Sequence, residues 1–371
     1  MAFTKIEVGG NFNLTDSQLH AECDEIDKRI SDIFKDWKYY TLTSSGREAL
    51  SLLLENWQPE HKVVLLPEYL CHTEIEPFKK NGYKIVYYRI NIDLTPVVAS
   101  VDSVVSANPG ACLYVQSYFG KDTLQYLRES FRKFRREHGV SIIEDRTQIW
   151  LSDTPIDSAD FYVTSLRKWL EIPDGGLLSS QMHDVSSFEK HPEVKKISDL
   201  FSCASLLKEK FYNTGEENLK DTFRQLFYQM NDIFAESDIP HDISLLSKKI
   251  LAMSDFADIS SRRKANYSVL MEGLKDIPCA MPVFTDLYNA EVPLYYPIYV
   301  KNRSDFQRYM CENRVYCPII WPRPADVDKW LCHSSHDIYD NILCVPCDQR
   351  YQEEDMNSII KKVYEQKNYL F

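Results

Sequence analysis

The sequence has no hydrophobic run that could cross a membrane, which would need about 18 consecutive apolar residues. Its first ten residues, MAFTKIEVGG, contain no apolar core of the kind found in a secretory signal. Internal repeats and low-complexity tracts are also missing from the sequence. These absences predict a soluble, cytoplasmic, globular protein.

Positive charge is in short supply. The chain has 43 Lys and Arg residues against 55 Asp and Glu residues, which gives a net charge of −12. A protein that binds nucleic acid or an anionic membrane needs a positively charged surface. We therefore expect neither nucleic acid nor membrane among its partners.

The length of 371 residues allows a sizeable core. Strand-like and helix-like segments alternate from residue 39 to residue 180, which predicts an α/β fold with a mostly parallel sheet. Residues 185–250 have helical spacing, and strand-rich sequence follows a long helix near residues 260–274. We expect a three-layer αβα large domain with the N-terminal segment in residues 1–250, and a smaller α+β domain in residues 251–371.

One helix is expected ahead of this alternation. Residues 18–37 carry apolar side chains at helical spacing, and Thr15 or Asp16 stands before them as an N-cap. The segment shows no catalytic feature.

The cysteines raise one question about metal binding. Cys344 and Cys347 form a CxxC pair. Three possible further ligands precede it: Cys332, His333 and His336. Zinc or redox chemistry is conceivable there, but the second group of ligands lacks the spacing of a zinc finger and Pro346 begins a turn. We interpret the pair as structural, and metal analysis would test the alternative.

Residues 142–180 carry the strongest functional pattern. A buried strand ends at Asp145, with Gln148 shortly after it, and the next buried strand ends at Ser165 and Lys168. Open α/β sheets hold ligands at the carboxyl ends of their strands. A carboxylate at one strand end and a lysine at the next suit pyridoxal phosphate (PLP), which has a basic ring nitrogen and an aldehyde.

A second feature suits an anion. The turn at Ser45 and Gly46 follows a strand and opens a helix that begins near Arg47. The amides at the start of a helix, together with its dipole, attract negative charge. The turn is therefore a candidate anion-binding site.

These motifs resemble those of fold-type I PLP-dependent enzymes, most of all the DegT-type sugar aminotransferase family. The family's EDxAQ strand end matches Glu144 to Gln148, and its Ser…Lys…Gly-Gly segment matches Ser165, Lys168 and the pair at 175–176. The Ser-Ser-Gly turn at residues 44–46 matches the family's phosphate-binding SGTxAL turn. The likeness runs in order from about residue 41 to the C-terminus.

The resemblance implies a role for each matched residue. Lys168 would form the Schiff base and move the substrate proton, and Asp145 would keep the ring nitrogen protonated. Gln148 would contact the ring 3-oxygen. Ser165 and the Ser45–Gly46 turn would hold the phosphate.

Other positions depart from the family or are ambiguous. Arg47 stands where the family has threonine, and a guanidinium there could still contact the phosphate. The aromatic residue that stacks on the ring falls near His72 or Tyr69. Ser165 and Lys168 are closer together than in the family, which weakens the inference of a sugar substrate. A homodimer is also implied.

We therefore expect a PLP-dependent aminotransferase that takes an amino group from a small-molecule donor and gives it to a keto-sugar nucleotide or a similar keto acceptor. Another PLP enzyme on the same fold is the alternative: a sugar dehydratase, a lyase or a desulfurase-like enzyme. A non-catalytic PLP-fold binding protein is a third interpretation.

Overall fold

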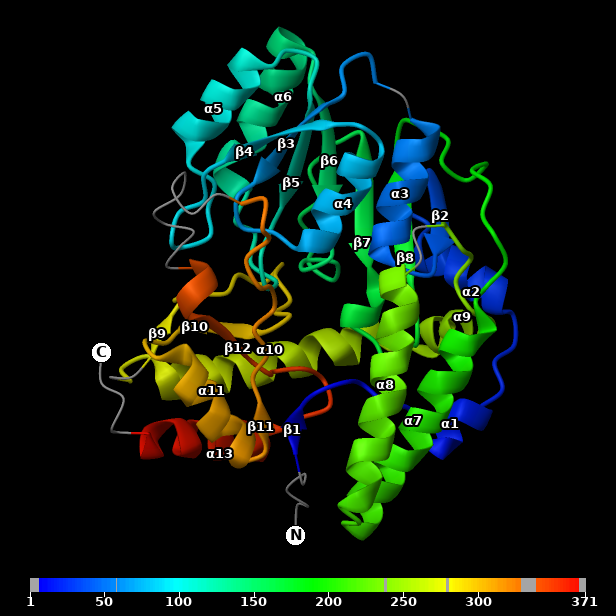
Figure 1. Ribbon diagram of the computed structural model, residues 1–371, viewed down its shortest axis with the longest axis vertical. Coiled ribbons are helices and arrows are strands. Elements are labelled where there is room, and N and C mark those ends of the chain that lie inside the picture. The colour runs from blue at the N-terminus through cyan, green and yellow to red at the C-terminus, as the bar shows by residue number, and fades with distance from the viewer. Residues whose placement is uncertain (1–6, 58, 237–238, 278–279, 328–337, 367–371) are drawn as a thin grey trace.

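A seven-stranded sheet forms the centre of the larger part of the molecule (Figure 1). The structure, a computed structural model, describes residues 7–57, 59–236, 239–277, 280–327 and 338–366. The sheet runs in the order β2-β8-β7-β6-β5-β3-β4. Its strands are β2 (Tyr39–Thr43), β3 (Val63–Pro67), β4 (Lys84–Tyr88), β5 (Cys112–Gln116), β6 (Ser141–Asp145), β7 (Phe161–Ser165) and β8 (Gly176–Ser180).

Most neighbouring strands in this sheet are parallel. Only β8 runs against its two neighbours, β2 and β7, while the pairs from β7 to β4 are all parallel. The mostly parallel sheet predicted from the sequence is therefore confirmed. Since β6 and β7 are parallel neighbours, their carboxyl ends lie at the same edge of the sheet.

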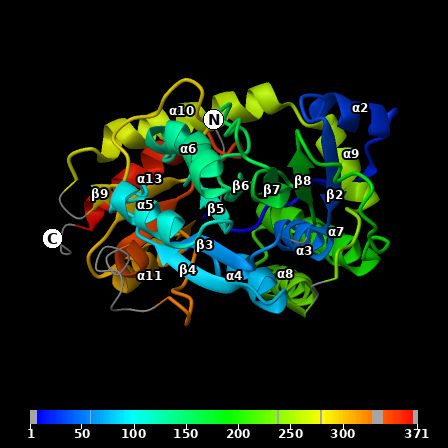
Figure 2. The same cartoon turned by 90° about the horizontal axis from the view of Figure 1, so that it is seen from above.

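Helices cover both faces of the sheet. Figure 2 shows α3 and α4 on one side and α6 on the other. These connecting elements are α3 (Gly46–Asn56), α4 (His72–Lys80), α5 (Val98–Ala107), α6 (Arg128–His138) and two short 3₁₀ helices, η1 (Gln125–Leu127) and η2 (Leu166–Lys168). The three-layer αβα arrangement is thus confirmed.

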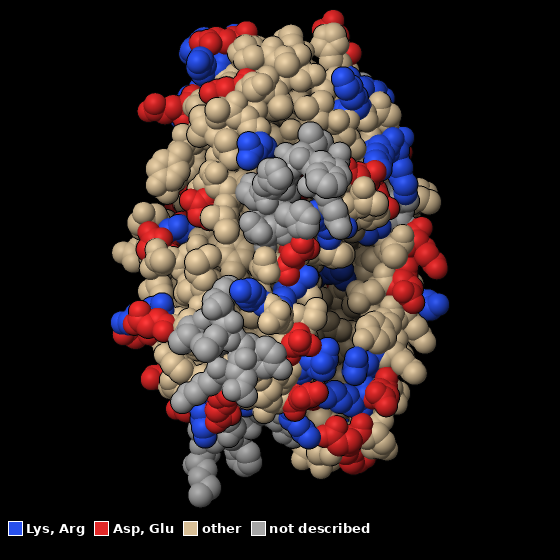
Figure 3. Space-filling view, turned by 60° about the vertical axis from the view of Figure 1, so that its left-hand side comes forward, with Lys and Arg blue, Asp and Glu red and all other residues tan. Residues whose placement is uncertain are grey.

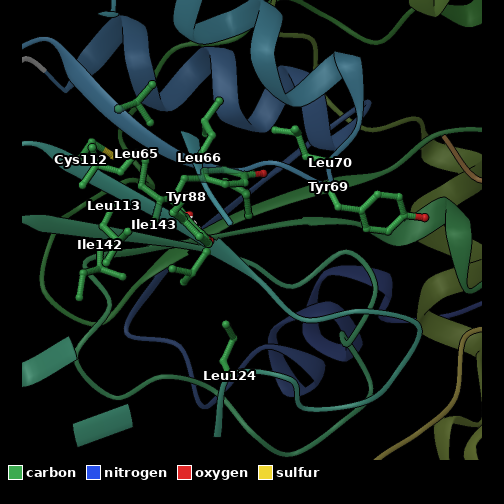
Figure 4. Packing of buried hydrophobic residues seen from close by; sticks show 14 of the residues in the cluster. Leu65, Leu66, Tyr69, Leu70, Tyr88, Cys112, Leu113, Leu124, Ile142 and Ile143 are labelled. Atoms are coloured by element: carbon green, nitrogen blue, oxygen red, sulfur yellow. Dashed lines mark hydrogen bonds between the residues drawn. The ribbon is translucent and has the colours of Figure 1, made fainter. Parts of the chain in front are cut away.

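The sheet is buried on both faces, which explains its continuous apolar strands. Leu65, Leu113, Ile142 and Ile143 come from three neighbouring strands and pack together, each fully buried (Figure 4). This packing fixes where the polar residues at the strand ends emerge.

The N-terminal helical segment is two helices, where the sequence predicted one. Helix α1 (Asp16–His20) begins with a capping box between Thr15 and Gln18, as the sequence indicated. It ends at Ala21, whose backbone is extended, and α2 (Ile26–Ile33) restarts after Glu25 in a left-handed conformation. A longer helical stretch follows the sheet, in α7 (Lys195–Thr214), α8 (Asn218–Glu236) and α9 (Leu245–Met253). These helices pack with α2 in a second core.

The C-terminal part has a third core, built around an antiparallel sheet in the order β12-β10-β9. A two-stranded parallel sheet joins the N-terminal β1 to β11. The elements here are β1 (Val8–Gly9), α10 (Phe256–Leu274), β9 (Met281–Pro282), β10 (Tyr296–Tyr299), α11 (Arg303–Glu312), β11 (Val315–Tyr316), β12 (Ile342–Val345) and α13 (Glu353–Glu365). The expected boundary between residues 250 and 251 falls inside α9 and stays a prediction. Among the described residues, no helix is long and apolar enough to span a membrane.

Candidate active site

A cavity of about 190 Å³ opens at the carboxyl ends of β6 and β7. The strand ends supply Asp145 and Ser165, and the short helix η2 supplies Lys168. The remaining wall comes from the starts of α3 and α4, the middle of β5 and the end of α8. The lining residues are Ser45, Gly46, Arg47, Leu50, Cys71, Thr73, Glu74, Tyr114, Asp145, Thr147, Ser165, Arg167, Lys168 and Phe234.

One end of the cavity is acidic. Asp145 is buried, and its carboxylate accepts hydrogen bonds from the Tyr114 hydroxyl and the Thr147 amide, each at 2.6 Å. Burial raises the pKa of Asp145, and these hydrogen bonds, with the nearby charge of Lys168, oppose that rise. Glu74 is a second buried carboxyl group in the same wall. This end therefore suits a group that carries a positively charged N–H.

The other end of the cavity is basic. Ser45 caps α3 by accepting the Glu48 amide at 3.2 Å, and no described residue accepts the first-turn amides of Gly46 and Arg47. The Arg167 guanidinium lies 4.3 Å from the ring centre of Phe234, whose carbonyl accepts a hydrogen bond from Arg47 at 3.3 Å. Burial, followed by the charge of Arg47, lowers the pKa of Arg167 to about 10. Helix amides and two guanidinium groups together favour an anion.

Lys168 lies on a loop that its surroundings hold in place. The Trp169 indole donates to the Thr147 carbonyl at 2.7 Å, and the Arg263 guanidinium lies 4.9 Å from the Trp169 ring. On the other side, the Leu166 amide donates to the Gly175 carbonyl at 3.0 Å. These contacts fix the backbone around Lys168, so its amine enters the cavity from a defined direction.

The glycine pair lets two loops approach closely. A Cβ atom on Gly176 would lie 2.2 Å from the Ser45 carbonyl oxygen, well inside contact distance. Gly175 donates its amide to the Ser44 carbonyl at 2.6 Å. The glycines thus join the lysine loop to the turn that opens α3.

A larger cavity of about 450 Å³ lies beside the first and shares Arg167 and Lys168 with it. Its wall includes two more arginines, Arg263 and Arg350, and polar side chains from α8 and α11. Arg350 is paired with Asp348 at 2.8 Å, whereas Arg263 donates to the carbonyls of residues 293 and 294. Figure 3 shows one face of the molecule, on which Lys and Arg side chains gather in and around a hollow.

Six of the residues predicted from the sequence line the smaller cavity: Lys168, Asp145, Ser165, Ser45, Gly46 and Arg47. Gln148 does not line it. Its side-chain oxygen accepts the Phe119 amide at 2.8 Å, and its buried amide nitrogen has no partner among the described residues. The expected contact of Gln148 with a ring oxygen therefore has no support in the cavity wall.

Neither predicted stacking residue lines the cavity. Tyr69 is fully buried in an aromatic cluster, with ring centres 4.9–5.4 Å from Tyr118, Trp321 and Tyr339. In Figure 4 its ring points away from the strand residues Leu65 and Leu113. His72 has a half-exposed side chain beside Glu76 at 3.6 Å. The start of α4 instead lines the cavity, through its N-cap Cys71 and through Thr73 and Glu74 in its first turn.

Several other residues of the wall were not predicted. Thr147 accepts the Ser165 amide at 2.9 Å and so links the two strand ends. In the sequence, only its position in the EDRTQ motif could have indicated that Thr147 belongs to the cavity wall. Tyr114 and Phe234 carry no signal in the sequence, since nothing in a single chain relates β5 or α8 to this cavity. Arg146, from the same motif, lies outside the cavity wall and forms an ion pair with Glu144 at 2.8 Å.

The CxxC pair lies elsewhere. Both cysteines are fully buried, Cys347 in the third core and Cys344 in the core of the large sheet. Across the described ranges, no group of three or more His, Cys, Asp and Glu side chains could hold a metal ion. Cys332, His333 and His336 lie outside the described residues.

No protein-family model and no curated protein matches this chain. Solved structures do match it. A DegT DnrJ EryC1 StrS aminotransferase from Brucella abortus is 16% identical with a TM-score of 0.64, over 95% of this chain and 91% of that one. PseC of Helicobacter pylori, an aminotransferase involved in the biosynthesis of pseudoaminic acid, is 14% identical with a TM-score of 0.69, over 97% and 98%.

A sugar aminotransferase, CalS13 from Micromonospora echinospora, is 13% identical with a TM-score of 0.65, over 99% of this chain and 100% of that one. In each case the likeness extends over nearly the whole of both chains. This chain therefore has the fold of these aminotransferases.

Proposed function

We propose that the smaller cavity binds PLP and that the chain is a PLP-dependent aminotransferase. One observation carries the proposal: a basic end, a lysine and an acidic end line one cavity. PLP presents the matching groups, with a phosphate on one side, an aldehyde in between and a basic ring nitrogen opposite. The shared fold with aminotransferases supports the same conclusion.

The phosphate end fits the chemistry of the residues present. The free amides at the start of α3, the Ser165 hydroxyl and the guanidinium groups of Arg47 and Arg167 are all donors. A Cβ atom on Gly46 would meet Ser165 Cβ at 3.0 Å, so glycine keeps this part of the cradle open. Arg47 thereby offers a side-chain contact where the resembled family has threonine.

The ring-nitrogen end fits as well. An ionised carboxylate has about four acceptor positions. Tyr114 and Thr147 occupy two of those of Asp145 and orient it, which leaves positions for a ring N–H. PLP, when bound, supplies an aldehyde that reacts with amines and a protonated ring that withdraws electrons.

Lys168 has two tasks in this proposal. Its amine would hold the cofactor through the aldehyde, and when free it would serve as the general base for the substrate proton. The contacts of the Trp169 side chain hold the backbone beside Lys168 in place. Asp145 would hold the ring proton as its ionised partner, and Arg167, a donor at the phosphate end, also borders the larger cavity.

The larger cavity gives the substrate its space. Its volume of about 450 Å³ exceeds what a small amino acid needs and suits a sugar-sized keto acceptor. The acceptor we propose is a keto-sugar nucleotide or a similar keto compound, with a small amino compound as donor. We also propose a homodimer in the cytoplasm.

The test is a visible spectrum of the purified protein, with and without added PLP, before and after borohydride. We expect a visible band that borohydride fixes covalently to Lys168, found by peptide mapping. Lys168→Ala should lose the fixation, whereas Lys84→Ala, which changes an exposed lysine on β4, should keep it. Amino donors are then screened by loss of the band together with release of a keto acid. Failure of the wild type to bind PLP would refute the proposal.

A further inference from the structure

Glu74 is a second acid in the cofactor cavity, and the chemistry described above gives it no task. It lies in the first turn of α4, and only 9% of it is exposed. One of its carboxyl oxygens, Oε2, is buried and has no hydrogen-bond partner among the described residues. Buried polar atoms are nearly always paired, so this orphan calls for an explanation.

The two acids of the cavity have different surroundings. Asp145 receives two short hydrogen bonds, from a hydroxyl and a backbone amide, and both favour its ionised form. Glu74 receives hydrogen bonds from the Cys71 backbone and the Gln116 side chain, but its Oε2 has no donor among the described residues. A buried oxygen without a donor makes the ionised form of Glu74 costly. When two nearby carboxyl groups differ in this way, the proton resides on the less supported one.

The charged and titratable groups around Glu74 point the same way. Burial, followed by the charge of Asp145, raises the pKa of Glu74 well above its usual value, and the charge of Lys168 opposes that rise. Cys71, the N-cap residue of the same helix, is a further titratable neighbour. The other titratable neighbours are buried tyrosines, from β4, β5 and two further segments: Tyr88, Tyr114, Tyr118 and Tyr339. The cation that opposes the rise is Lys168, which is also the group that PLP would engage.

We propose that Glu74 is a positioning residue that keeps its proton when PLP is bound, so that Asp145 alone is the ionised partner of the ring nitrogen. The inference rests on the proposed function. A neutral Glu74 can donate its proton to an acceptor beside the ring, which an ionised one cannot. It also leaves one negative charge, that of Asp145, to balance one positive ring. A second negative charge, on Glu74, would hold the ring proton more tightly and change how strongly the ring withdraws electrons.

The experiment compares wild type with Glu74→Gln and Glu74→Ala, each loaded with PLP. Glutamine has the shape of a protonated glutamate, carries no charge and can donate a hydrogen bond. We therefore expect Glu74→Gln to keep the pH midpoint of the visible band within about 0.3 units of the wild type. Glu74→Ala should move that midpoint and weaken PLP binding about tenfold, which is the effect of about 1.4 kcal/mol.

A second readout observes the proton itself. The PLP-loaded wild type should show the infrared carbonyl band of a protonated carboxylic acid, and Glu74→Gln should lose it. Glu129→Gln, which removes an exposed charge on α6, is the matched control and should leave both readouts unchanged.

The outcomes separate the two proposals. If the wild type forms no visible band with PLP, both the proposed function and this inference are wrong. If wild type forms the band but Glu74→Gln shifts its midpoint by about one unit or more, Glu74 is ionised in the holoenzyme and only this inference fails. The inference also fails if the infrared difference spectrum between wild type and Glu74→Gln contains no carboxylic-acid carbonyl band, or if Glu74→Ala behaves like the wild type.

Discussion

Replacement of Gly176 by alanine tests how the lysine loop and the phosphate turn are joined. The new Cβ atom would lie 2.2 Å from the Ser45 carbonyl oxygen and 2.5 Å from Thr43 Oγ1. That carbonyl already accepts hydrogen bonds from the Ala49 amide and the Thr43 hydroxyl, so it is held in place. The clash involves backbone atoms, and a side-chain rotation cannot relieve it.

The expected magnitude follows from the geometry. Side-chain carbons do not approach other atoms closer than 3.0 Å, so the turn at Ser45 must move by about 0.8 Å. Overpacking of this kind costs about 1–3 kcal/mol of the free energy of unfolding. The same displacement moves the amides of Gly46 and Arg47 away from the phosphate position. A shift of about 1 Å in a positioned group can cost up to about 100-fold, so we expect PLP affinity to fall by about 10- to 100-fold.

The assay is PLP titration by visible absorbance, together with thermal unfolding of the protein without PLP. Gly139→Ala is the control: this glycine ends α6 with φ +64° and has no atom within 4 Å of the added Cβ. It should lower the unfolding temperature through backbone strain and leave PLP affinity unchanged. If Gly176→Ala binds PLP as tightly as the wild type, the two loops are not coupled and the reasoning is wrong.

Three further predictions follow from other contacts. Tyr114→Phe removes a 2.6 Å hydrogen bond to Asp145, and such a bond to a charged acceptor contributes about 1.5–3 kcal/mol. The pKa of Asp145 should therefore rise, and the visible band should titrate at a shifted pH. An unchanged titration contradicts this. Arg167→Gln should weaken PLP about 10-fold or more in equilibrium titrations, because it removes a cation from the phosphate end; equal affinity contradicts that placement. Asp174 is buried, and burial raises its pKa from 3.8 to about 6, so the folded state binds this proton more tightly than the unfolded state. Its stabilising effect is complete below pH 3.8 and is lost as pH rises to about 6. Relative to Asp174→Asn, the free energy of unfolding of the wild type in urea should fall by up to about 3 kcal/mol over that interval. Parallel pH profiles of the two proteins would refute the prediction.

The parts of the site that lie at strand ends could be predicted from the sequence. Buried strands read as apolar runs, and polar residues directly after them must emerge at the edge of the sheet. That rule places Asp145 and Ser165 together once β6 and β7 are neighbours, and Lys168 follows three residues later. The turn at Ser45 was predictable for a second reason: small polar residues favour the start of a helix.

The wall between β3 and α4 could not be predicted at the same precision. The loop is short, and a shift of one residue sends a different side chain toward the cavity. Tyr69 and His72 were the candidates by residue type, but the backbone turns so that Cys71 and Glu74 face inward. Phe234 illustrates a second limit. It lies in α8 and contacts the cavity only because of tertiary packing, which no local sequence pattern predicts.

The contacts of β1 with β11 and with Tyr351 constrain when the protein can finish folding. The Gly9 amide donates to the Tyr351 hydroxyl, across a sequence separation of 342 residues. At a synthesis rate of about 5–20 residues per second, the first strand waits roughly 20–70 s for its last partner. During that time its amides are open to other partners, including the chaperones that hold nascent chains. A C-terminal fragment made without the first strand should correspondingly expose the edge of β11.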